Sequence, residues 1–348
     1  MPTIQDVAKA AGVSISTVSY VLSGSRPISP ATKQRIHQAM AAIGYQPNAL
    51  AKGLASRRSR IIALLMSPGD RDLGSTEMEF VSGAARAARA AGYHLVLWAD
   101  SLESPADLAG LGGNGLVEAV LLMEVKLQDW RLAVLQGLGI PFALIGRPAD
   151  PSGLDWVDID FDRTIADAML RLEAAGHRNF LLVNQSRQSH AAGYGPVVRI
   201  LESYRRHCAE RGLVGESVFC DSDAPAGLGC IQRAIADWPR TTAVLAMNDH
   251  ALPGIMHGLQ AAGRHIPDDI SLVALLCSRR TANHYWPPLS IMEIPGAELG
   301  HLGITRLIGR IEEAAADPLT PSLIPCQWLE RGTTGPAAGF VSKLKGES

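Results

Sequence analysis

The feature that most constrains this chain is a regular alternation of short apolar runs and amphipathic stretches, which begins at residue 61. Continuous apolar strands that alternate with helices are typical of parallel sheets covered on both faces. There are too many such units for one small sheet, so we expect two α/β subdomains that divide near residues 160–163. The predicted strands are 61–66, 94–99, 119–124, 141–146, 156–160, 179–184, 217–221, 242–248 and 271–276, and the clearest predicted helices are 77–92, 162–175, 196–212 and 250–262.

Composition excludes some classes of protein. Of the 348 residues, 47% are apolar and 19% are charged, a composition that can bury a core. The length predicts two or three domains. No apolar run reaches the ~18–20 residues that span a bilayer, and the first residues lack the pattern of a secretory signal. The five cysteines are odd in number and form no CxxC pair, so a disulfide framework is not indicated. We therefore expect a cytoplasmic protein.

The charge of the chain is unevenly distributed. Residues 1–60 carry eight Lys and Arg residues and a single acidic one, Asp6, whereas the remainder has 24 basic and 33 acidic residues. A small basic module on an acidic body is typical of a protein that touches nucleic acid with one end. A solvated basic face without a partner is the alternative, and charge alone does not decide between them.

The basic module has the pattern of three short helices. Thr3 and Asp6 have the spacing of a capping box at the start of the first helix, which Gly12 ends. A third helix starts at Ser29-Pro30, because proline is favoured at the first helical position, and it ends at Gly44. A glycine turn between the first two helices describes a helix-turn-helix unit.

The second of these helices starts at Ser14 or Ser16. In a helix-turn-helix unit it enters the major groove, and its early residues face the base edges. We expect Ile15, Ser16 and Tyr20 to read bases, and Thr17 and Ser19 to hold phosphates.

Residues 47–55 form a short helical pattern that is too short and too glycine-containing to be stable alone. A basic linker, 56–60, follows. Such a segment is expected to fold only on a surface, and DNA with its phosphates is the obvious one.

These segments, TIQDVAKAAGVSISTVSYVLSG and GYQPNALAKGLA, resemble the headpiece and hinge of the LacI/GalR family of transcriptional regulators. The resemblance implies a dimer, most often a repressor, on a palindromic operator. It also implies paired hinge helices in the minor groove, where Leu54 wedges between base pairs; an ordinary apolar contact is the alternative for Leu54. The candidate DNA-binding residues are Thr3, Ile15, Ser16, Thr17, Ser19, Tyr20, Asn48, Ala51, Lys52, Leu54, Arg57 and Arg58.

The body also resembles this family, in pieces such as IPFALIGRP, LEAAGHRNFLLV and AMNDHALPGIMHGLQAAGRHIPDDISLVAL, and the likeness covers about residues 3–333. It implies a core like a periplasmic binding protein, made of two doubly wound parallel-sheet subdomains that the chain crosses between three times, near 160–163, 290–294 and 320–324. The expected domains are a helix-turn-helix headpiece 1–46, a hinge 47–60, a core 61–333 and a tail 334–348. Within the core, the N-subdomain takes about 61–160 and 294–320, and the C-subdomain about 163–290 and 322–333, with the helix 297–316 in the first and the strand 323–330 in the second.

A small-molecule effector would occupy the cleft at the carboxyl ends of the strands. Polar groups there would select hydroxyl patterns. For Asp249 a helix cap is an equal alternative, and for Asp160 a role in fixing the crossover. The candidate effector-binding residues are Asp70, Thr76, Met123, Glu124, Arg147, Asp160, Arg199, Asn248, Asp249 and Leu276.

Two positions depart from the family's usual sugar clamp. If Ser203-Tyr204 replaces the family's Gly-aromatic pair, Ile200 takes the position of its Arg, and Arg199 lies one residue away. Leu276 stands where an Asp is usual. Both changes remove charge-assisted hydrogen bonds. A sugar effector is therefore expected only from the resemblance to the family. The alternatives are a less polar or differently shaped ligand, or a protein that has lost control by an effector.

We expect a DNA-binding regulator that a small molecule controls allosterically. It would need no cofactor or metal, and would be no enzyme, because the sequence carries no catalytic or metal-binding constellation. Gly110–Gly115 fits GxGxxG but does not follow a strand, as a dinucleotide loop must. A binding protein without DNA regulation is the alternative, against which the basic headpiece argues. Tetrameric members of the family that this chain resembles add a tail with leucine heptads; the tail here lacks heptads, so the resemblance implies a dimer rather than a tetramer.

Overall fold

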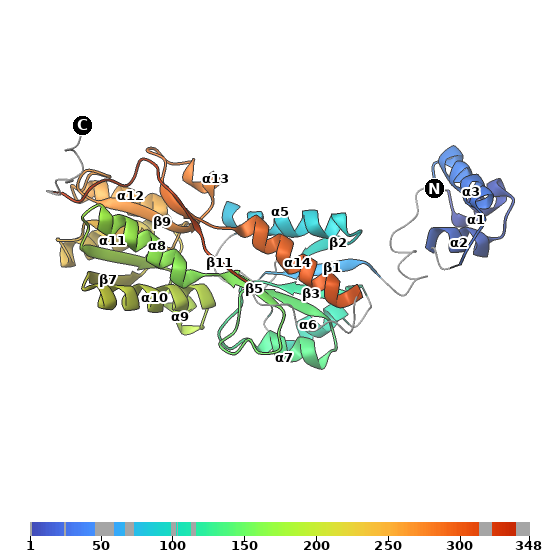
Figure 1. Ribbon diagram of the computed structural model, residues 1–348, viewed down its shortest axis with the longest axis horizontal. Coiled ribbons are helices and arrows are strands. Elements are labelled where there is room, and N and C mark those ends of the chain that lie inside the picture. The colour runs from blue at the N-terminus through green and yellow to red at the C-terminus, as the bar shows by residue number, and fades with distance from the viewer. Residues whose placement is uncertain are drawn as a thin grey trace, which may run out of the picture. The chain divides into compact units, whose positions relative to one another are not determined.

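The computed structural model describes residues 2–23, 26–45, 59–66, 73–98, 102, 104–112, 116–312 and 322–338 (Figure 1). The chain divides into two compact units. The first, the headpiece unit, comprises residues 1–61 and 110–118, and the second, the core unit, comprises residues 62–109 and 119–348. Each unit is described by itself.

The headpiece unit contains the three predicted helices. The side chain of Thr3 accepts a hydrogen bond from the Asp6 N–H and the Asp6 carboxylate accepts one from the Thr3 N–H, so the predicted capping box is confirmed. Glycines in the left-handed region, Gly12 and Gly44, end the first and third helices as predicted. The helices are α1 (Ile4–Ala11), α2 (Ile15–Ser23) and α3 (Pro30–Ile43).

Ser14 decides where α2 begins. Its hydroxyl accepts a hydrogen bond from the Thr17 N–H at 3.1 Å, so the first of the two predicted start points is the N-cap. The inward faces of the three helices form a small apolar core, made of Val7, Ala8, Ala11, Val18, Ile36 and Ala39.

The core unit is built on two six-stranded sheets, and we call the part built on each the first and the second subdomain. The first sheet has the order β11-β5-β4-β3-β1-β2, and its described pairings are parallel. Its strands are β1 (Ile61–Leu65), β2 (His94–Trp98), β3 (Ala119–Leu122), β4 (Phe142–Ile145), β5 (Trp156–Ile159) and β11 (Ser322–Ile324).

The second sheet has the order β12-β10-β9-β8-β6-β7, in which only β12 pairs antiparallel. The predicted doubly wound α/β class is therefore confirmed in both subdomains. Its strands are β6 (Asn179–Asn184), β7 (Val214–Phe219), β8 (Ala243–Ala246), β9 (Ser271–Cys277), β10 (Ser290–Glu293) and β12 (Gln327–Leu329).

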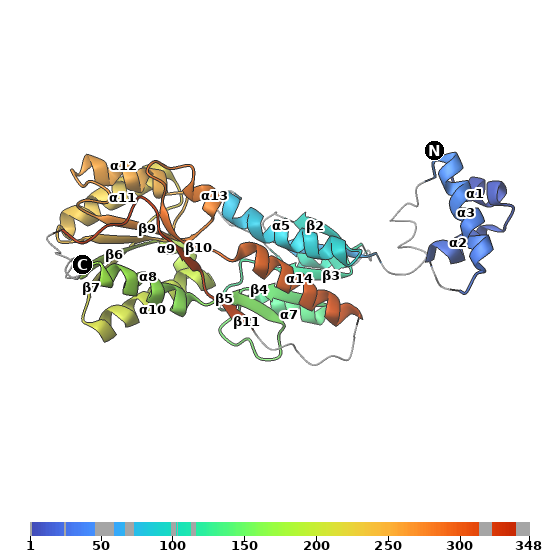
Figure 2. The ribbon, with the colours of Figure 1, turned by 45° about the horizontal axis from the view of Figure 1, so that its top comes forward.

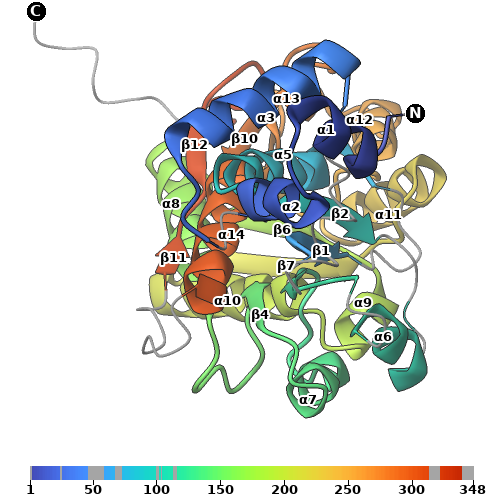
Figure 3. The same ribbon diagram turned by 90° about the vertical axis from the view of Figure 1, so that its right-hand side faces the viewer.

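Helices cover both faces of each sheet, which explains why the strands are almost wholly apolar. In the first subdomain α5 and α14 lie on one face and α6 and α7 on the other (Figures 1 and 3). In the second, α8 packs with α10 and α11 packs with α12, on opposite faces (Figure 2). The helices are α5 (Ser75–Ala90), α6 (Pro105–Gly112), α7 (Trp130–Gly137), α8 (Phe161–Ala174), α9 (Arg187–Ala191), α10 (Gly195–Arg211), α11 (Ala224–Asp237), α12 (Leu252–Ala261), α13 (Arg279–Ala282) and α14 (Gly296–Glu312).

The chain crosses between the subdomains three times; the second crossing lies at the end of the predicted range 290–294, and the third lies later than the predicted range 320–324. The predicted strand 323–330 is two strands: β11 pairs with β5 in the first sheet, and β12 pairs with β10 in the second. The third crossing therefore lies at 325–326. Strand β10 likewise still belongs to the second sheet, so the second crossing follows residue 293.

Helices α5 and α14 touch backbone to backbone. A Cβ at Gly83 would collide with the carbonyl of Ala297, and one at Gly300 would collide with the carbonyl of Phe80. Both glycines are thus required by close packing rather than by an unusual backbone conformation.

Among the described residues, the helices include none whose length and apolar character would let it span a membrane.

Candidate functional site

The first candidate site is the outer face of α2. Ile15 is 47% exposed and Ser16 is also exposed, whereas Val18 on the opposite side of the helix is fully buried. The hydroxyl of Ser14 lies 2.8 Å from those of Ser16 and Thr17. An exposed isoleucine beside a cluster of hydroxyls gives α2 both apolar and hydrogen-bonding groups, which are the means of reading base edges.

The remaining predicted contacts in the headpiece are placed as follows. Ser19 and Tyr20 are half-buried, and the guanidinium of Arg26 lies 4.9 Å from the centre of the Tyr20 ring. Thr3 is exposed, but its side chain is engaged in capping α1. The predicted hinge contacts Asn48, Ala51, Lys52, Leu54, Arg57 and Arg58 lie outside the described residues.

The second candidate site is a cleft between the two sheets of the core unit. It encloses about 80 Å³, well above the ~10–15 Å³ that a single water molecule needs. The lining includes seven of the predicted effector contacts: Thr76, Met123, Glu124, Arg147, Arg199, Asp249 and Leu276.

One polar wall of the cleft is built around Asp158. Arg147 donates a hydrogen bond to its carboxylate at 2.7 Å. Burial raises the pKa of Asp158 to about 6, although the charges of Arg147 and Arg199 act in the opposite direction. Arg199 donates to the carbonyl of Pro148 at 3.0 Å, and burial lowers its pKa. Two guanidinium groups and one weakly acidic carboxyl thus face the cleft.

The space that Arg199 occupies depends on a glycine. A Cβ at Gly195 would lie 2.5 Å from Nη1 of Arg199. The next residue, Ile200, is fully buried in the core. Arg199 therefore reaches the cleft, although it lies one residue before the position where the family usually has its Arg.

Opposite this wall, polar groups link the two subdomains directly. The Thr76 hydroxyl of α5 donates to the Asp249 carboxylate, which follows β8, at 3.2 Å. The Ser75 hydroxyl, also in α5, lies 2.5 Å from that of Thr281 in α13. Beside the Arg199 wall, the Leu127 N–H donates to the carbonyl of Gly193 at 2.7 Å. The cleft is thus closed on both sides by contacts between the subdomains.

Gln185 supplies a polar atom without a partner. The residue is 5% exposed and lines the cleft, and its Oε1 has no hydrogen-bond partner among the described residues. Buried polar atoms are normally paired. An acceptor left open beside a cleft is suited to a donor on a bound ligand.

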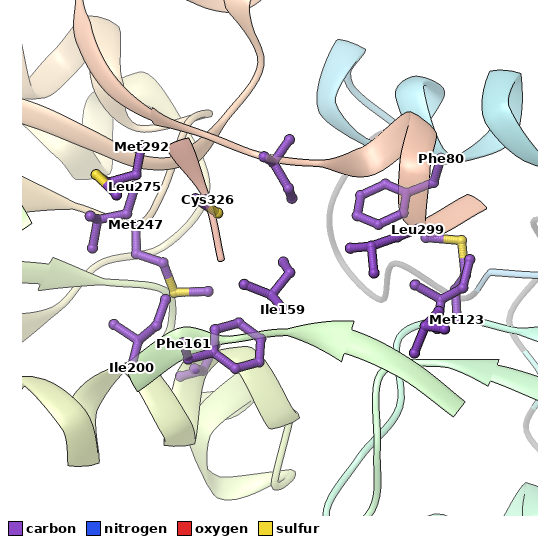
Figure 4. Packing of buried hydrophobic residues seen from close by; sticks show 14 of the residues in the cluster. Phe80, Met123, Ile159, Phe161, Ile200, Met247, Leu275, Met292, Leu299 and Cys326 are labelled. Carbon is purple, nitrogen blue, oxygen red and sulfur yellow. The ribbon is translucent and has the colours of Figure 1, made fainter. Parts of the chain in front are cut away.

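Apart from Glu77, Glu124 and Tyr194, the rest of the lining is apolar. Figure 4 shows Phe80, Met123 and Leu299 of the first subdomain facing Met247 and Leu275 of the second. Phe161, at the start of α8, lies beside Met247. These apolar side chains would pack against an apolar face of a ligand.

Two lining residues adopt a backbone conformation that favours glycine. Glu124 follows β3 with φ 55°, and Leu276 lies near the end of β9 with φ 50°. Such a conformation costs about 1–2 kcal/mol for an ordinary residue, and it clusters at ligand sites. The backbone at both strand ends is thus held in the shape that the cleft requires.

Three predicted effector contacts are not found in the lining. Asp160 caps α8 by accepting from the Arg163 N–H at 3.0 Å, a role that differs from the crossover role foreseen as its alternative. Asn248 is buried and donates to the carbonyls of Cys220 and Asp221. Asp70 lies outside the described residues.

Sequence reasoning missed four polar residues that line the cleft: Glu77, Asp158, Gln185 and Tyr194. Asp158 stands in an otherwise apolar strand, WVDI, and that interruption was a usable signal. Gln185 follows the apolar strand β6, as several predicted contacts follow theirs. The apolar residues of the lining carried no signal, because they read as ordinary core.

Two sequence families match the chain. "Bacterial regulatory proteins, lacI family" matches residues 3–48, and "Periplasmic binding protein-like domain" matches residues 170–334. The transcriptional regulator CelR of Thermobifida fusca is 29% identical over 326 residues, which cover 90% of this chain and 94% of CelR. The ribose operon repressor of Escherichia coli strain K12 is 27% identical, over 96% of this chain and all of that repressor.

Solved structures share the fold. A CelR–cellobiose complex superposes with a TM-score of 0.71 at 26% identity, covering 96% of this chain and all of that one. A Lac repressor dimer bound to operator and to the anti-inducer ONPF gives a TM-score of 0.79 at 22% identity, covering 96% and 99% of the two chains.

Proposed function

Because this chain is a DNA-binding transcriptional regulator of the LacI family, we propose that it binds an inverted-repeat operator as a homodimer and that a small molecule in the core cleft controls that binding. The observation that carries the proposal is that one chain contains both features. Helix α2 presents exposed hydroxyl groups, and the closed cleft of the core unit contains the Oε1 atom of Gln185, which has no partner among the described residues. It acts as a repressor in the cytoplasm and catalyses no reaction.

DNA recognition is proposed to run through α2. Ile15 and Ser16 present exposed side chains at the start of the helix, where a recognition helix meets base edges. Thr17 and Ser19 hold phosphates on either side, and Tyr20, steadied by Arg26, completes the reading face. Lys52, Arg57 and Arg58 add phosphate contacts, and Thr3 holds α1 in place beside them.

Effector control is proposed to act through the contacts that close the cleft. A ligand between Arg199 and Gln185 would displace or strengthen the Thr76–Asp249 hydrogen bond, and so shift the balance between closed and open arrangements of the subdomains. CelR was solved with cellobiose. In this chain the apolar lining supports a ligand with an apolar face, either a sugar that stacks on Phe161 or another cyclic metabolite.

The experiment that tests the proposal is selection of binding sites from a random pool of DNA duplexes. Purified full-length protein at about 0.15 M salt should enrich an inverted repeat whose half-sites lie about one turn apart. Enrichment of a single half-site would contradict the dimer. Binding that remains unspecific and salt-sensitive, even with a pool of cell metabolites added, would contradict operator recognition.

The hinge is tested with the same operator. Leu54→Ala should weaken operator binding far more than binding to unrelated DNA, because a wedge acts only where the duplex kinks. Gel-shift titrations on both duplexes measure the two affinities. An equal loss on both would mean that Leu54 makes only an ordinary contact.

A further inference from the structure

A second cleft lies in the second subdomain, at its outer edge strand. It is an open hollow of about 410 Å³ and shares no lining residue with the cleft between the two sheets, which we call the central cleft. Strand β7, the last strand of the second sheet, forms its floor with Ser217, Val218 and Phe219. A volume of this size falls within the range of small-molecule sites.

Three arginines from three different helices converge on this cleft: Arg187 of α9, Arg205 of α10 and Arg233 of α11. The only acidic residue in the lining is Asp237. The cleft therefore has an excess of two positive charges.

These arginines differ from their neighbours in having no anionic partner among the described residues. On α10, Arg206 and Arg211 form ion pairs with Asp162 and Glu173, and Arg199 donates to a carbonyl. Arg205, on the same helix, makes no ion pair or hydrogen bond with a described residue through its side chain. The same is true of Arg187 and Arg233. Three guanidinium groups thus keep their hydrogen-bond donors available in one place.

Part of this positive surface is held in position. The guanidinium of Arg187 lies 5.1 Å from the centre of the Phe219 ring, and His190 packs against the same ring with centroids 5.0 Å apart. A stacked guanidinium keeps its N–H groups in a fixed plane, which suits a bidentate contact with an oxyanion. Less side-chain entropy is then lost when a ligand binds.

The charge of Arg233 also acts on Cys230 of α11, which lines the cleft. A hydrogen bond with Cys220 lowers the pKa of the Cys230 thiol, and the nearby charge of Arg233 lowers it further.

Charged residues also protect exposed edge strands from pairing with other chains. That role needs no hollow and no arginine held against a ring, so it does not account for this arrangement.

We propose that this cleft binds the phosphoryl group of a phosphorylated metabolite of about sugar-phosphate size. Arg205 and Arg233 hold the phosphoryl oxygens, Arg187 provides a fixed third contact from the Phe219 ring, and the Ser217 hydroxyl donates to the remaining oxygen or to the sugar. The regulator thereby has a second ligand site that works independently of the central cleft.

The test is calorimetric titration of the full-length protein with ribose 5-phosphate, and with ribose as the unphosphorylated control. Saturable binding of the phosphate, weakened at least tenfold in an Arg205→Gln/Arg233→Gln variant, is the expected result. A charge-matched variant, Arg163→Gln/Arg280→Gln, removes two exposed arginines of the same subdomain from other places and should bind within twofold of the unchanged protein.

Three outcomes would overturn the proposal: no saturable binding, an equal loss in both double variants, or a loss caused by Arg199→Gln instead. The last would put the ligand in the central cleft. Thermal unfolding of each variant checks that the fold is kept. Because the titration contains no DNA, its result is separate from that of the operator selection.

Discussion

Gln185 is a buried residue whose side-chain oxygen has no partner among the described residues. Leaving such an atom without a hydrogen bond costs about 1–3 kcal/mol, which a bound donor would recover. We predict that Gln185→Leu leaves the unfolding free energy unchanged or higher, yet weakens binding of the effector at least tenfold. Thermal unfolding, and titration with the effector that releases operator in a metabolite screen, measure the two effects. A variant that binds the effector as tightly as the unchanged protein would place the ligand elsewhere.

Asp158 gives the cleft a pH dependence. Its pKa is about 6 in the folded protein and 3.8 as a free side chain, so the folded state keeps this proton in a pH range where the unfolded chain loses it. Stability therefore falls as pH rises from about 4 to about 6, by about 3 kcal/mol from this group at 1.36 kcal/mol per pKa unit.

The neutral variant Asp158→Asn lacks this titration. Chemical denaturation at pH 4 and pH 7 should show a smaller loss of stability with rising pH in the variant than in the unchanged protein. Two parallel profiles would mean that Arg147, 2.7 Å away, keeps the carboxylate charged throughout.

At the scale of elements, the headpiece depends on its helix caps because its apolar core is small. Ser29 caps α3 by accepting from the Thr32 N–H, one residue before Pro30. Ser29→Ala should destabilise the headpiece by about 1 kcal/mol, whereas Ser29→Asp retains a capping oxygen and should not. Hydrogen exchange of the amides of α3 measures the difference, and equal exchange in the two variants would contradict it.

The contact between α5 and α14 allows a test within one helix. Gly300→Ala places a methyl group against the Phe80 carbonyl and should destabilise the core by more than ~2 kcal/mol. Gly309 lies in the same helix with open space around it, so Gly309→Ala should be neutral or stabilising by up to about 1 kcal/mol. Denaturant unfolding of both variants tests the close approach, which similar curves would refute.

At the scale of the whole molecule, we predict that a partner contacts β2, the edge strand of the first sheet. Val96 and Leu97 of β2 are 43% and 38% exposed, and an open apolar edge strand is unusual unless another surface covers it. We predict that Val96→Lys/Leu97→Lys shifts the proposed dimer toward monomer and lowers operator affinity. Leu170→Lys, at a comparably exposed leucine of α8, is the control. Sedimentation of both distinguishes them; a dimer that survives the double change would use another face.

Much of this architecture is predictable from the sequence, because apolar strands with helices between them leave few alternatives. The helix caps at Thr3 and Ser29 were also predictable, since capping is a local interaction. The ends of β11 and β12 were not: Pro325 interrupts the predicted strand 323–330, but only the pairing partners decide that β11 and β12 belong to different sheets. The rim of the cleft was predictable, because it lies at the ends of the strands. The apolar lining and the partner of Asp158 were not, because packing between distant segments of the chain determines them.

The late arrival of α14 and β11 in the chain has a consequence for how the protein is made. Both complete the first subdomain, yet a ribosome synthesises them only after the whole of the second sheet except β12. Until then the face of α5 that α14 later covers remains uncovered in the emerging chain. Chaperones and proteases can bind a nascent domain in that state. The same interleaving limits evolution by recombination. A single breakpoint in the gene cannot exchange one intact subdomain for that of a relative, so new effector clefts arise mainly by point substitution along their walls.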